Sequence, residues 1–598
     1  MDQRRAARSA ARSEIHARLP RAAAGRLPGD LIVSLSQIAA AAVTTVRQVG
    51  VLHDAGLIDL RRPDLLWYAA RSTRRFGPIA GSVRLSAKRF PDRLAVVDDE
   101  RLLTYRELHR STDALARSWM DLGLTADSTI GVLCRDHVGL VEAMVAVAKM
   151  GARLVLMNTG FAGAQLADVA AREGLDAIVA DDEFRSAARR LPGSVRRLSI
   201  DTSTLQWTGS VIPPRQGGFV ILTGGTTGTP KGVPRRVQSP LAAAQFFDRV
   251  PLRPGGTTLL CAPLFHGTAL SQFILSLTLG CTNILHGRFD APRALAQIEE
   301  HGVTAMVVVP TMLRRIIGLG SEEIARYRTS SLRIVFSAGA ALPPALGTAV
   351  IEQFGPVLYN FYGCTETGTA TIATPEDWIA APGTVGRPPI GITVRLYADN
   401  RHLVSRPGRK GTVYVGNSIA FQGYSGGGGK KMIDGLMSTG DIGHWDDGGR
   451  LFIDGRDDDM IVSGGENVFP GEIEDLLYTH DAIAEAAVIG VPDDDFGQRL
   501  AAFVVPEAAD ISVDDVKQYV REHLARYKVP RDVHFVDELP RTTTGRSRGQ
   551  DWPNWPRPEP TMSDHRRLPG TLARAVIGVA AVPTRPAVPA VVLRARSI

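Results

Sequence analysis

Cysteine is scarce in this chain. Only four cysteines occur in 598 residues, none of them in a Cys-x-x-Cys pair: Cys134, Cys261, Cys281 and Cys364. This number and spacing exclude a disulfide framework and a cysteine-based zinc site. We therefore predict a protein of a reducing, cytoplasmic compartment.

The sequence also lacks an N-terminal apolar run long enough to cross a membrane. Residues 31–46 are uncharged, but they fall short of the roughly 20 residues that a spanning helix needs. Basic residues lie on both sides of the run, at Arg26 and Arg47. We predict a buried or interfacial helix here, which would allow peripheral contact with the inner membrane face.

A basic patch in the body of the chain is missing as well. The net charge of +7 comes from the ends, because residues 1–30 hold seven Arg against three acids and residues 541–598 hold ten Arg against three acids. The middle is therefore net negative. This distribution is not that of a nucleic-acid-binding face, and we expect no nucleic-acid partner.

What the chain does contain is an alternation of short apolar runs and helical spacing. Strands are predicted at residues 94–99, 130–134, 219–223, 304–310 and 332–339, with a helical pattern at residues 105–122 and a helix followed by a strand within residues 141–158. This alternation predicts an α/β fold of sheets covered by helices. Residues 1–75 precede it and are expected to form an N-terminal extension. Composition changes again at residues 426–431 and 455–459.

The strongest chemical signal follows the predicted strand at 219–223. The segment ILTGGTTGTPKGV offers a run of backbone N–H groups and hydroxyls to phosphate oxygens, and Lys231 adds a positive charge. It lacks the Gly-Lys-Ser/Thr ending of a Walker A loop. A flexible surface turn is the alternative. The candidate phosphate-binding residues are Thr223, Gly224, Gly225, Thr226, Thr227, Gly228 and Lys231.

This loop resembles the phosphate loop of the adenylate-forming superfamily, which includes acyl-CoA synthetases, aryl-acid ligases and luciferases. The segment NFYGCTETG (360–368) is similar to the second signature of that superfamily. The resemblance assigns Tyr362 to stacking on adenine, Thr365 to a phosphate oxygen and Glu366 to Mg²⁺. A carboxylate suits a hard cation and an aromatic face suits a purine, so the residue types fit these roles.

Two further segments resemble the parts of the superfamily that face the base and the acid. SAGAAL (337–342) looks like the glycine turn beside adenine, where small residues let the backbone approach the base. PLFHG (263–267) matches the loop that faces the acyl group, with His266 as a gate; a merely packed histidine is the alternative. The candidate residues are Gly339, Ala340, Ala341, His266 and Gly267.

The resemblance continues to about residue 545. In STGD (438–441), Asp441 would accept the ribose hydroxyls, and in GRDDDMIVSGGENVFPGEIE (455–474), Arg456 would reach ribose or phosphate. Asp458 takes the hinge position. Gly464 and Gly465 lie where the superfamily closes over the pantetheine thiol of CoA.

The resemblance implies an ATP-dependent ligase with a large N-terminal α/β domain, residues 76–454, and a smaller, mobile C-terminal α+β domain, residues 455–548. ATP, Mg²⁺ and CoA are the implied cofactor and co-substrates, and a carboxylic acid is the small-molecule partner. We expect a fatty acid as the substrate. The alternatives are an aryl-acid or other acid–CoA ligase, a ligase that passes its adenylate to a separate carrier, and an inert nucleotide- or acyl-CoA-binding relative.

The C-terminal end departs from the superfamily pattern. Where the superfamily has a catalytic lysine, the run LPRTTTGRSRGQ carries Arg546, and Lys528 is the last lysine of the chain. Arginine keeps the charge but not the shape of the contact, so we expect impaired adenylation. The Pro- and Arg-rich tail, residues 549–598, is expected to be disordered. A frameshift at the codon for Arg546 would explain both features; a genuine basic tail is the alternative.

Overall fold

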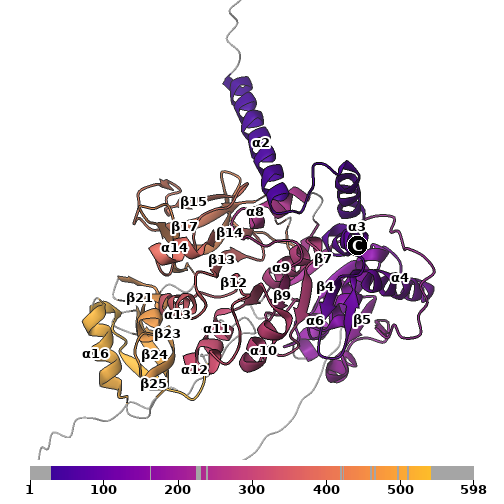
Figure 1. Ribbon diagram of the computed structural model, residues 1–598. Helices are drawn as coiled ribbons and strands as arrows, with labels where there is room; N and C mark the ends of the chain where they lie inside the picture. Colours follow the sequence, from indigo (N-terminus) through magenta and orange to yellow (C-terminus); the bar gives the residue numbers. More distant parts are fainter. Residues whose placement is uncertain are drawn as a thin grey trace, which may run out of the picture. The chain divides into compact units, whose positions relative to one another are not determined.

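A computed structural model describes residues 29–161, 163–223, 230–236, 240–417, 421, 423–457, 461–463, 466–493, 497–507, 511–524 and 526–539. Within these residues the strands form four sheets, and helices pack against the sheets (Figure 1). The helices are α2 (Gly29–Asp54), α3 (Pro63–Arg89), α4 (Tyr105–Asp121), α5 (Val138–Met150), α6 (Gly163–Glu173), α7 (Arg185–Ala188), α8 (Ala244–Phe247), α9 (Gly267–Thr278), α10 (Ala291–His301), α11 (Pro310–Ile317), α12 (Ser321–Ile324), α13 (Pro344–Phe354), α14 (Pro375–Ala380), α15 (Pro470–Leu477) and α16 (Val513–His523).

The first large sheet is built mainly from parallel strands. Those between β13 and β1 are parallel, and one antiparallel strand closes each edge. Its order is β14 (Gly368–Ala373), β13 (Leu358–Cys364), β12 (Ile334–Ser337), β11 (Ala305–Val308), β9 (Thr257–Leu260), β10 (Thr282–Leu285), β1 (Leu94–Val97) and β2 (Leu102–Thr104). Parallel strands bring their carboxyl ends to one edge, where α/β proteins bind ligands.

The second sheet has the same character. Its order is β6 (Arg196–Leu198), β5 (Ala177–Ala180), β3 (Thr129–Leu133), β4 (Arg153–Leu156), β7 (Phe219–Thr223) and β8 (Lys231–Arg235), with only β8 antiparallel to its neighbour. Strand β3 is buried along its whole length. The predicted α/β alternation is present, and the strand predicted at residues 219–223 matches β7 residue for residue.

Helices α4 and α5 form part of the core of the large domain. Helix α4 begins with a capping box, in which the Thr104 hydroxyl accepts from the Glu107 N–H and the Glu107 carboxylate accepts from the Thr104 N–H. This pairing satisfies two N–H groups that the first turn leaves open. Helix α5, almost entirely buried, packs against α3 and α4. Its Lys149 ammonium forms a buried ion pair of 2.9 Å with Asp113 of α4.

The N-terminal helices reach into this core. The run predicted at residues 31–46 is part of the longer helix α2, and Leu52 and Ala55 near the end of α2 are buried in the core. Helix α3 bends at Gly77, which has a φ of +75°, and its second half packs against α5 and α9. The expected domain boundary at residue 75 falls inside α3. In the part of the chain that is described, no helix is long and apolar enough to cross a membrane.

The third sheet is antiparallel and follows the first in sequence. It contains β16 (Leu403–Val404), β15 (Thr393–Tyr397), β17 (Gly411–Gly416), β19 (Leu436–Trp445), β18 (Met432–Ile433) and β20 (Leu451–Arg456), which pairs with β19. Residues 423–431 form a glycine-rich loop between β17 and β18. The pairing of β19 with β20 places Asp441 directly opposite Arg456.

The fourth sheet belongs to the C-terminal part. It consists of β22 (Glu466–Val468), β21 (Ile461–Ser463), β24 (Gly497–Pro506), β23 (Ile483–Asp493) and β25 (Asp532–Phe535), and α15 and α16 pack against it (Figure 1). It has its own apolar core, in which Val488 and Val504 of the sheet meet Ile473 and Val516 of the helices. A smaller α+β unit after the large α/β part is therefore present. The predicted tail at residues 549–598 lies outside the described residues.

Candidate functional site

Several predicted site residues converge on one edge of the first sheet. Strands β9, β11, β12 and β13 are parallel neighbours, so the segments after them lie side by side. Strand β9 leads to the segment with His266, β12 leads to Gly339, and β13 leads to Thr365 and Glu366. The sheet topology thus brings together three motifs that are far apart in the sequence.

The turn after β12 leaves its backbone accessible. Gly339 has a φ of +94°, a conformation that residues with a side chain rarely adopt. Gly339 and Ala341 are exposed and Ala340 is half-buried. The turn therefore offers open backbone, as a planar ligand lying against it would require.

Strands β13 and β14 form a tight hairpin that carries Tyr362, Thr365 and Glu366. A Cβ on Gly363 would lie 2.1 Å from the Gly368 carbonyl oxygen on the opposite strand. Since that neighbour is backbone, it cannot move aside as a side chain would. The hairpin therefore needs glycine at position 363 to keep its closest approach.

Gly363→Ala is expected to lower the free energy of unfolding by about 1 to 3 kcal/mol, the usual cost of overpacking. Denaturant unfolding of the full chain measures this. Gly193→Ala is the matched control, because a Cβ there meets nothing within 4 Å. Equal stability of the two variants would show that the hairpin tolerates a Cβ.

Glu366 lies in a network with two other polar side chains. Its carboxylate Oε1 accepts a hydrogen bond of 2.7 Å from the Tyr424 hydroxyl, and the residue is only 8% exposed. The Lys231 ammonium lies 5.3 Å from the centre of the Tyr424 ring. Tyr424 therefore contacts both charged groups that the sequence motifs assign to the phosphates and their metal ion.

Arg235 fixes the backbone of the same turn. This buried arginine of β8 donates from Nη2 to the Glu366 carbonyl oxygen at 2.8 Å and to the Thr365 carbonyl oxygen. It lies four positions after Lys231 on the same strand. Strand β8 of the second sheet is thus tied directly to the β13–β14 turn of the first.

Tyr362, Asp441 and Arg456 form a second network. The Tyr362 hydroxyl donates to Asp441 Oδ2 at 2.6 Å, and Arg456 Nη1 lies 3.3 Å from Asp441 Oδ1. Burial, together with the Asp441 carboxylate, raises the pKa of Tyr362 well above its usual value, which keeps the phenol a hydrogen-bond donor. Asp441 therefore contacts both Tyr362 and Arg456, and these three residues were predicted from three separate motifs.

A buried carboxylate, Asp136, binds the backbone of the segment that contains His266. Both carboxylate oxygens of Asp136, which follows β3, accept from the Leu264 N–H at 3.2 and 3.0 Å. Burial raises the pKa of Asp136 to about 7. His266 then begins helix α9 as its N-cap residue, and burial lowers its pKa to about 4. A Cβ on the neighbouring Gly267 would meet Ile221 of β7 at 3.2 Å, so this segment packs beside the phosphate-loop strand.

Sequence reasoning missed Tyr424, Arg235 and Asp136. Each acts through a hydrogen bond to a motif more than 50 positions away, which no local pattern reveals. Only the backbone of Thr223, the last residue of β7, belongs to the described part. The remaining predicted residues lie outside it: Gly224, Gly225, Thr226, Thr227, Gly228, Asp458, Gly464, Gly465 and Arg546.

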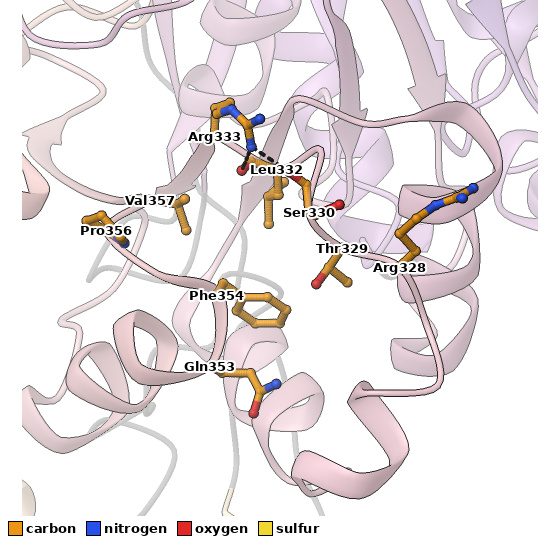
Figure 2. Close-up of a pocket in the computed structure, with 9 residues that line it drawn as sticks. All are labelled: Arg328, Thr329, Ser330, Leu332, Arg333, Gln353, Phe354, Pro356 and Val357. Atoms are coloured by element: carbon orange, nitrogen blue, oxygen red, sulfur yellow. Dashed lines mark hydrogen bonds between the residues drawn. The ribbon is translucent and has the colours of Figure 1, made fainter.

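A surface hollow elsewhere does not belong to this site. Figure 2 shows its lining residues, among them Arg328, Arg333 and Phe354. Leu332–Arg333 and Pro356–Val357 immediately precede β12 and β13, so the hollow lies at the amino ends of these strands. The predicted residues gather at the carboxyl ends. The hollow contains none of them.

The converging groups suit a polyanionic ligand with a cation. The Glu366 carboxylate is a hard oxygen donor of the kind that Mg²⁺ prefers, and Lys231 supplies a positive charge near the ring of Tyr424, whose hydroxyl binds Glu366. Asp441 offers acceptors to vicinal hydroxyls, and the turn at Gly339 offers open backbone. These are the groups that a nucleoside phosphate needs, and no acid–base pair is required among them.

Comparisons with known proteins agree with this geometry. Residues 83–425 match the family described as AMP-binding enzyme, and residues 472–546 match the AMP-binding enzyme C-terminal domain. The 2-succinylbenzoate–CoA ligase of Geobacillus sp. (strain WCH70) is 32% identical over 76% of this chain and 93% of its own length. The indoleacetate–CoA ligase of Aromatoleum aromaticum is 31% identical over 77% of this chain and 94% of its own.

Solved structures are similar over most of the chain. The o-succinylbenzoate CoA synthetase of Bacillus subtilis, in complex with its acyl-adenylate intermediate, is 26% identical with a TM-score of 0.71, covering 79% of this chain and 97% of that one. The same enzyme with ATP and a magnesium ion gives a TM-score of 0.69 at 26% identity, over 78% and 98%.

Proposed function

Because the chain belongs to the AMP-binding enzymes and shares their α/β fold of a large N-terminal and a small C-terminal domain, we propose that it is an ATP-dependent acid–CoA ligase. The observation that carries this proposal is the meeting of Lys231, Tyr424 and Glu366 beside the contact between Tyr362 and Asp441. ATP, Mg²⁺ and CoA are the cofactor and co-substrates of this reaction.

The reaction proceeds in two steps. A carboxylate oxygen of the acid attacks the α-phosphorus of ATP, the bond to the bridging oxygen breaks, and pyrophosphate leaves with that electron pair. The sulfur of CoA then attacks the acyl carbon, the thiol proton is lost to solvent, and AMP leaves with the carboxylate oxygen. Positioned charge stabilises the phosphoryl transfer more than acid–base groups do.

Each of the candidate residues has a separate role in the first step. Lys231 offsets phosphate charge, Asp441 and Arg456 hold the ribose, and the turn at Gly339 lies against the base with Tyr362. Glu366 would hold Mg²⁺, which neutralises phosphate charge when bound; its carboxylate, which accepts a hydrogen bond from Tyr424, fits that ion. The Thr365 hydroxyl binds a phosphate oxygen, and His266 with Gly267 borders the acid.

An aryl acid is the substrate class with the better support. The relatives named above are ligases of succinylbenzoate and indoleacetate, and a further similar structure is an anthranilate–CoA ligase with anthranoyl-AMP, 25% identical with a TM-score of 0.70 over 78% of this chain and 95% of that one. The fatty-acid substrate expected from the sequence has no such support, and no described residue favours it. Fatty acids therefore form the second arm of the test.

The deciding experiment measures pyrophosphate release by the purified full chain with MgATP, CoA and a matched panel of aryl and fatty acids. Release that depends on an aryl acid is the expected result. Dependence on a fatty acid instead would overturn the substrate class but keep the ligase. A folded chain that binds ATP but releases no pyrophosphate with any acid would be an inert nucleotide-binding relative, and the proposal would be wrong.

The two-domain mechanism extends the proposal to the C-terminal part. In it, residues 455–548 rotate about Asp458 against residues 76–454, and Gly464 and Gly465 close over the thiol of CoA. The extension at residues 1–75, its peripheral membrane contact through residues 31–46 and a cytoplasmic location remain predictions. CoA rather than a separate carrier is the proposed acceptor.

Tyr424→Phe is expected to raise the Mg²⁺ concentration needed for half-maximal pyrophosphate release by roughly tenfold, since a hydrogen bond to a charged group is worth about 1.5 to 3 kcal/mol. The ring that lies near Lys231 stays in place. Tyr397→Phe is the control, because that hydroxyl bonds to Asp434 at 2.7 Å, away from the motifs. An unchanged Mg²⁺ requirement in Tyr424→Phe would show that the hydroxyl does not position Glu366.

A further inference from the structure

Lys430 is a charged residue that no predicted role includes. It stands at the end of the glycine-rich loop between β17 and β18, two positions before β18 begins. The loop is anchored to β8, the strand that follows the phosphate loop, because the Ser425 N–H donates to the Gly232 carbonyl oxygen at 2.9 Å. At its other end the Ser438 N–H donates to the Lys431 carbonyl oxygen at 2.9 Å. The loop that carries Lys430 therefore runs from β8, next to Lys231, to Ser438 of the ribose motif.

The ammonium of Lys430 lies beside the Tyr362–Asp441 network. Its Nζ donates to the Thr439 carbonyl oxygen at 3.3 Å. The Thr439 hydroxyl in turn accepts from the Tyr362 hydroxyl at 3.1 Å and from the Asp441 N–H at 3.0 Å. Lys430 thus lies beside the ribose motif, on the same loop as Tyr424, whose hydroxyl binds Glu366.

The charge of Lys430 is not neutralised by a carboxylate within the described residues. No ion pair joins it to an acid there, and the nearby Asp441 already binds Arg456 and Tyr362. Lys430 is half-buried, whereas its neighbour Lys431 is exposed. An ammonium that has lost part of its hydration gains from an anionic partner. A compact ammonium suits phosphate oxygens, to which it offers a point charge with three donors.

We propose that Lys430 binds the phosphates of the nucleotide and so supplies, from the large domain, a lysine ammonium to a site whose C-terminal lysine is replaced by Arg546. This inference rests on the proposed function, since it needs a nucleotide in the site. Lys430 transfers no proton and forms no bond; it binds the α-phosphate side of the ligand while the acid attacks. The contact is specific to phosphate and does not involve the base or ribose.

The test compares Lys430→Met with Lys431→Met in the full chain by calorimetric titration with MgATP and, separately, with adenosine. Lys430→Met is expected to weaken ATP binding by about tenfold and to leave adenosine binding unchanged. Lys430→Arg, which keeps the charge but not the compact ammonium, should recover only part of the ATP affinity. Lys431→Met, an exposed lysine one position away, should bind both ligands as the wild type does.

The outcomes separate this inference from the function it rests on. If Lys430→Met binds ATP as tightly as the wild type, Lys430 makes no phosphate contact and the inference is wrong. If it loses ATP and adenosine equally, the side chain supports the ribose network instead, which also overturns the inference. If the wild type binds no ATP, the proposed function itself fails. Thermal unfolding of each variant identifies any that do not fold, and Lys430→Gln, which also removes the charge, replaces Lys430→Met if that variant does not fold.

Discussion

Glu366→Gln is expected to lower acid-dependent pyrophosphate release by about a hundredfold or more, a loss typical of removing a charged group that stabilises the transition state. Glutamine has the same shape and still accepts the Tyr424 hydrogen bond, so the hairpin should fold. What is lost is the negative charge that would hold Mg²⁺ against the phosphates. Steady-state rates over a range of Mg²⁺ concentrations measure the effect.

The control for this variant is Glu352→Gln. Glu352 is an exposed acid of helix α13, with no predicted role, so its variant should retain the wild-type rate. Thermal unfolding checks that Glu366→Gln is folded. A folded variant with wild-type activity at every Mg²⁺ concentration would remove Glu366 from the proposed metal site.

Arg546→Lys is expected to raise the rate of acid-dependent pyrophosphate release at least tenfold. The superfamily pattern has lysine at this position, and the longer, planar guanidinium does not reproduce a point contact to a carboxylate and an α-phosphate. A tenfold gain corresponds to about 1.4 kcal/mol of transition-state stabilisation. Single-turnover measurement with MgATP and acid, without CoA, isolates the adenylation step.

Arg548→Lys makes the same chemical change two positions away and should leave the rate unaltered. Thioester formation from supplied acyl-adenylate should change less than adenylation in Arg546→Lys, since the resemblance assigns that step to the other face of the small domain. An Arg546→Lys rate no higher than that of the wild type would show that arginine serves there. Reading the codon for Arg546 tests the frameshift independently: an arginine codon other than AGG or AGA rules it out.

The parts of the fold that depend on local pattern were predictable from the sequence. The strand at residues 219–223 is an apolar run between polar turns, and it matches β7; the pattern at residues 105–122 likewise matches α4 within one residue. The other predicted strands of the two large sheets are likewise short apolar runs bounded by turn residues. The domain boundaries stay predictions; residue 75 lies inside α3, whose second half packs against helices that come much later in the chain.

Single-residue motifs were readable, but the contacts between them were not. Tyr362, Glu366 and Asp441 each stand in a recognisable segment, and the structure brings Tyr362 and Asp441 within 2.6 Å. Tyr424 and Arg235 carry no such signal, because an isolated tyrosine or arginine in a polar stretch has many uses. Their contacts with the Glu366 turn depend on the order of the strands and on the packing of the loop at residues 423–431 against β8. The sequence pattern specifies neither.

The hydrogen bond between Ser425 and Gly232 has a consequence for the folding of the chain during its synthesis. These two residues are 193 positions apart, and Asp441 and Arg456 come later still. A chain made from its N-terminus exposes the phosphate loop and the Glu366 turn well before their partners leave the ribosome. Contacts over such long separations also form slowly. A nascent chain that stops before residue 424 therefore has both large sheets in its sequence, yet it cannot complete the nucleotide site.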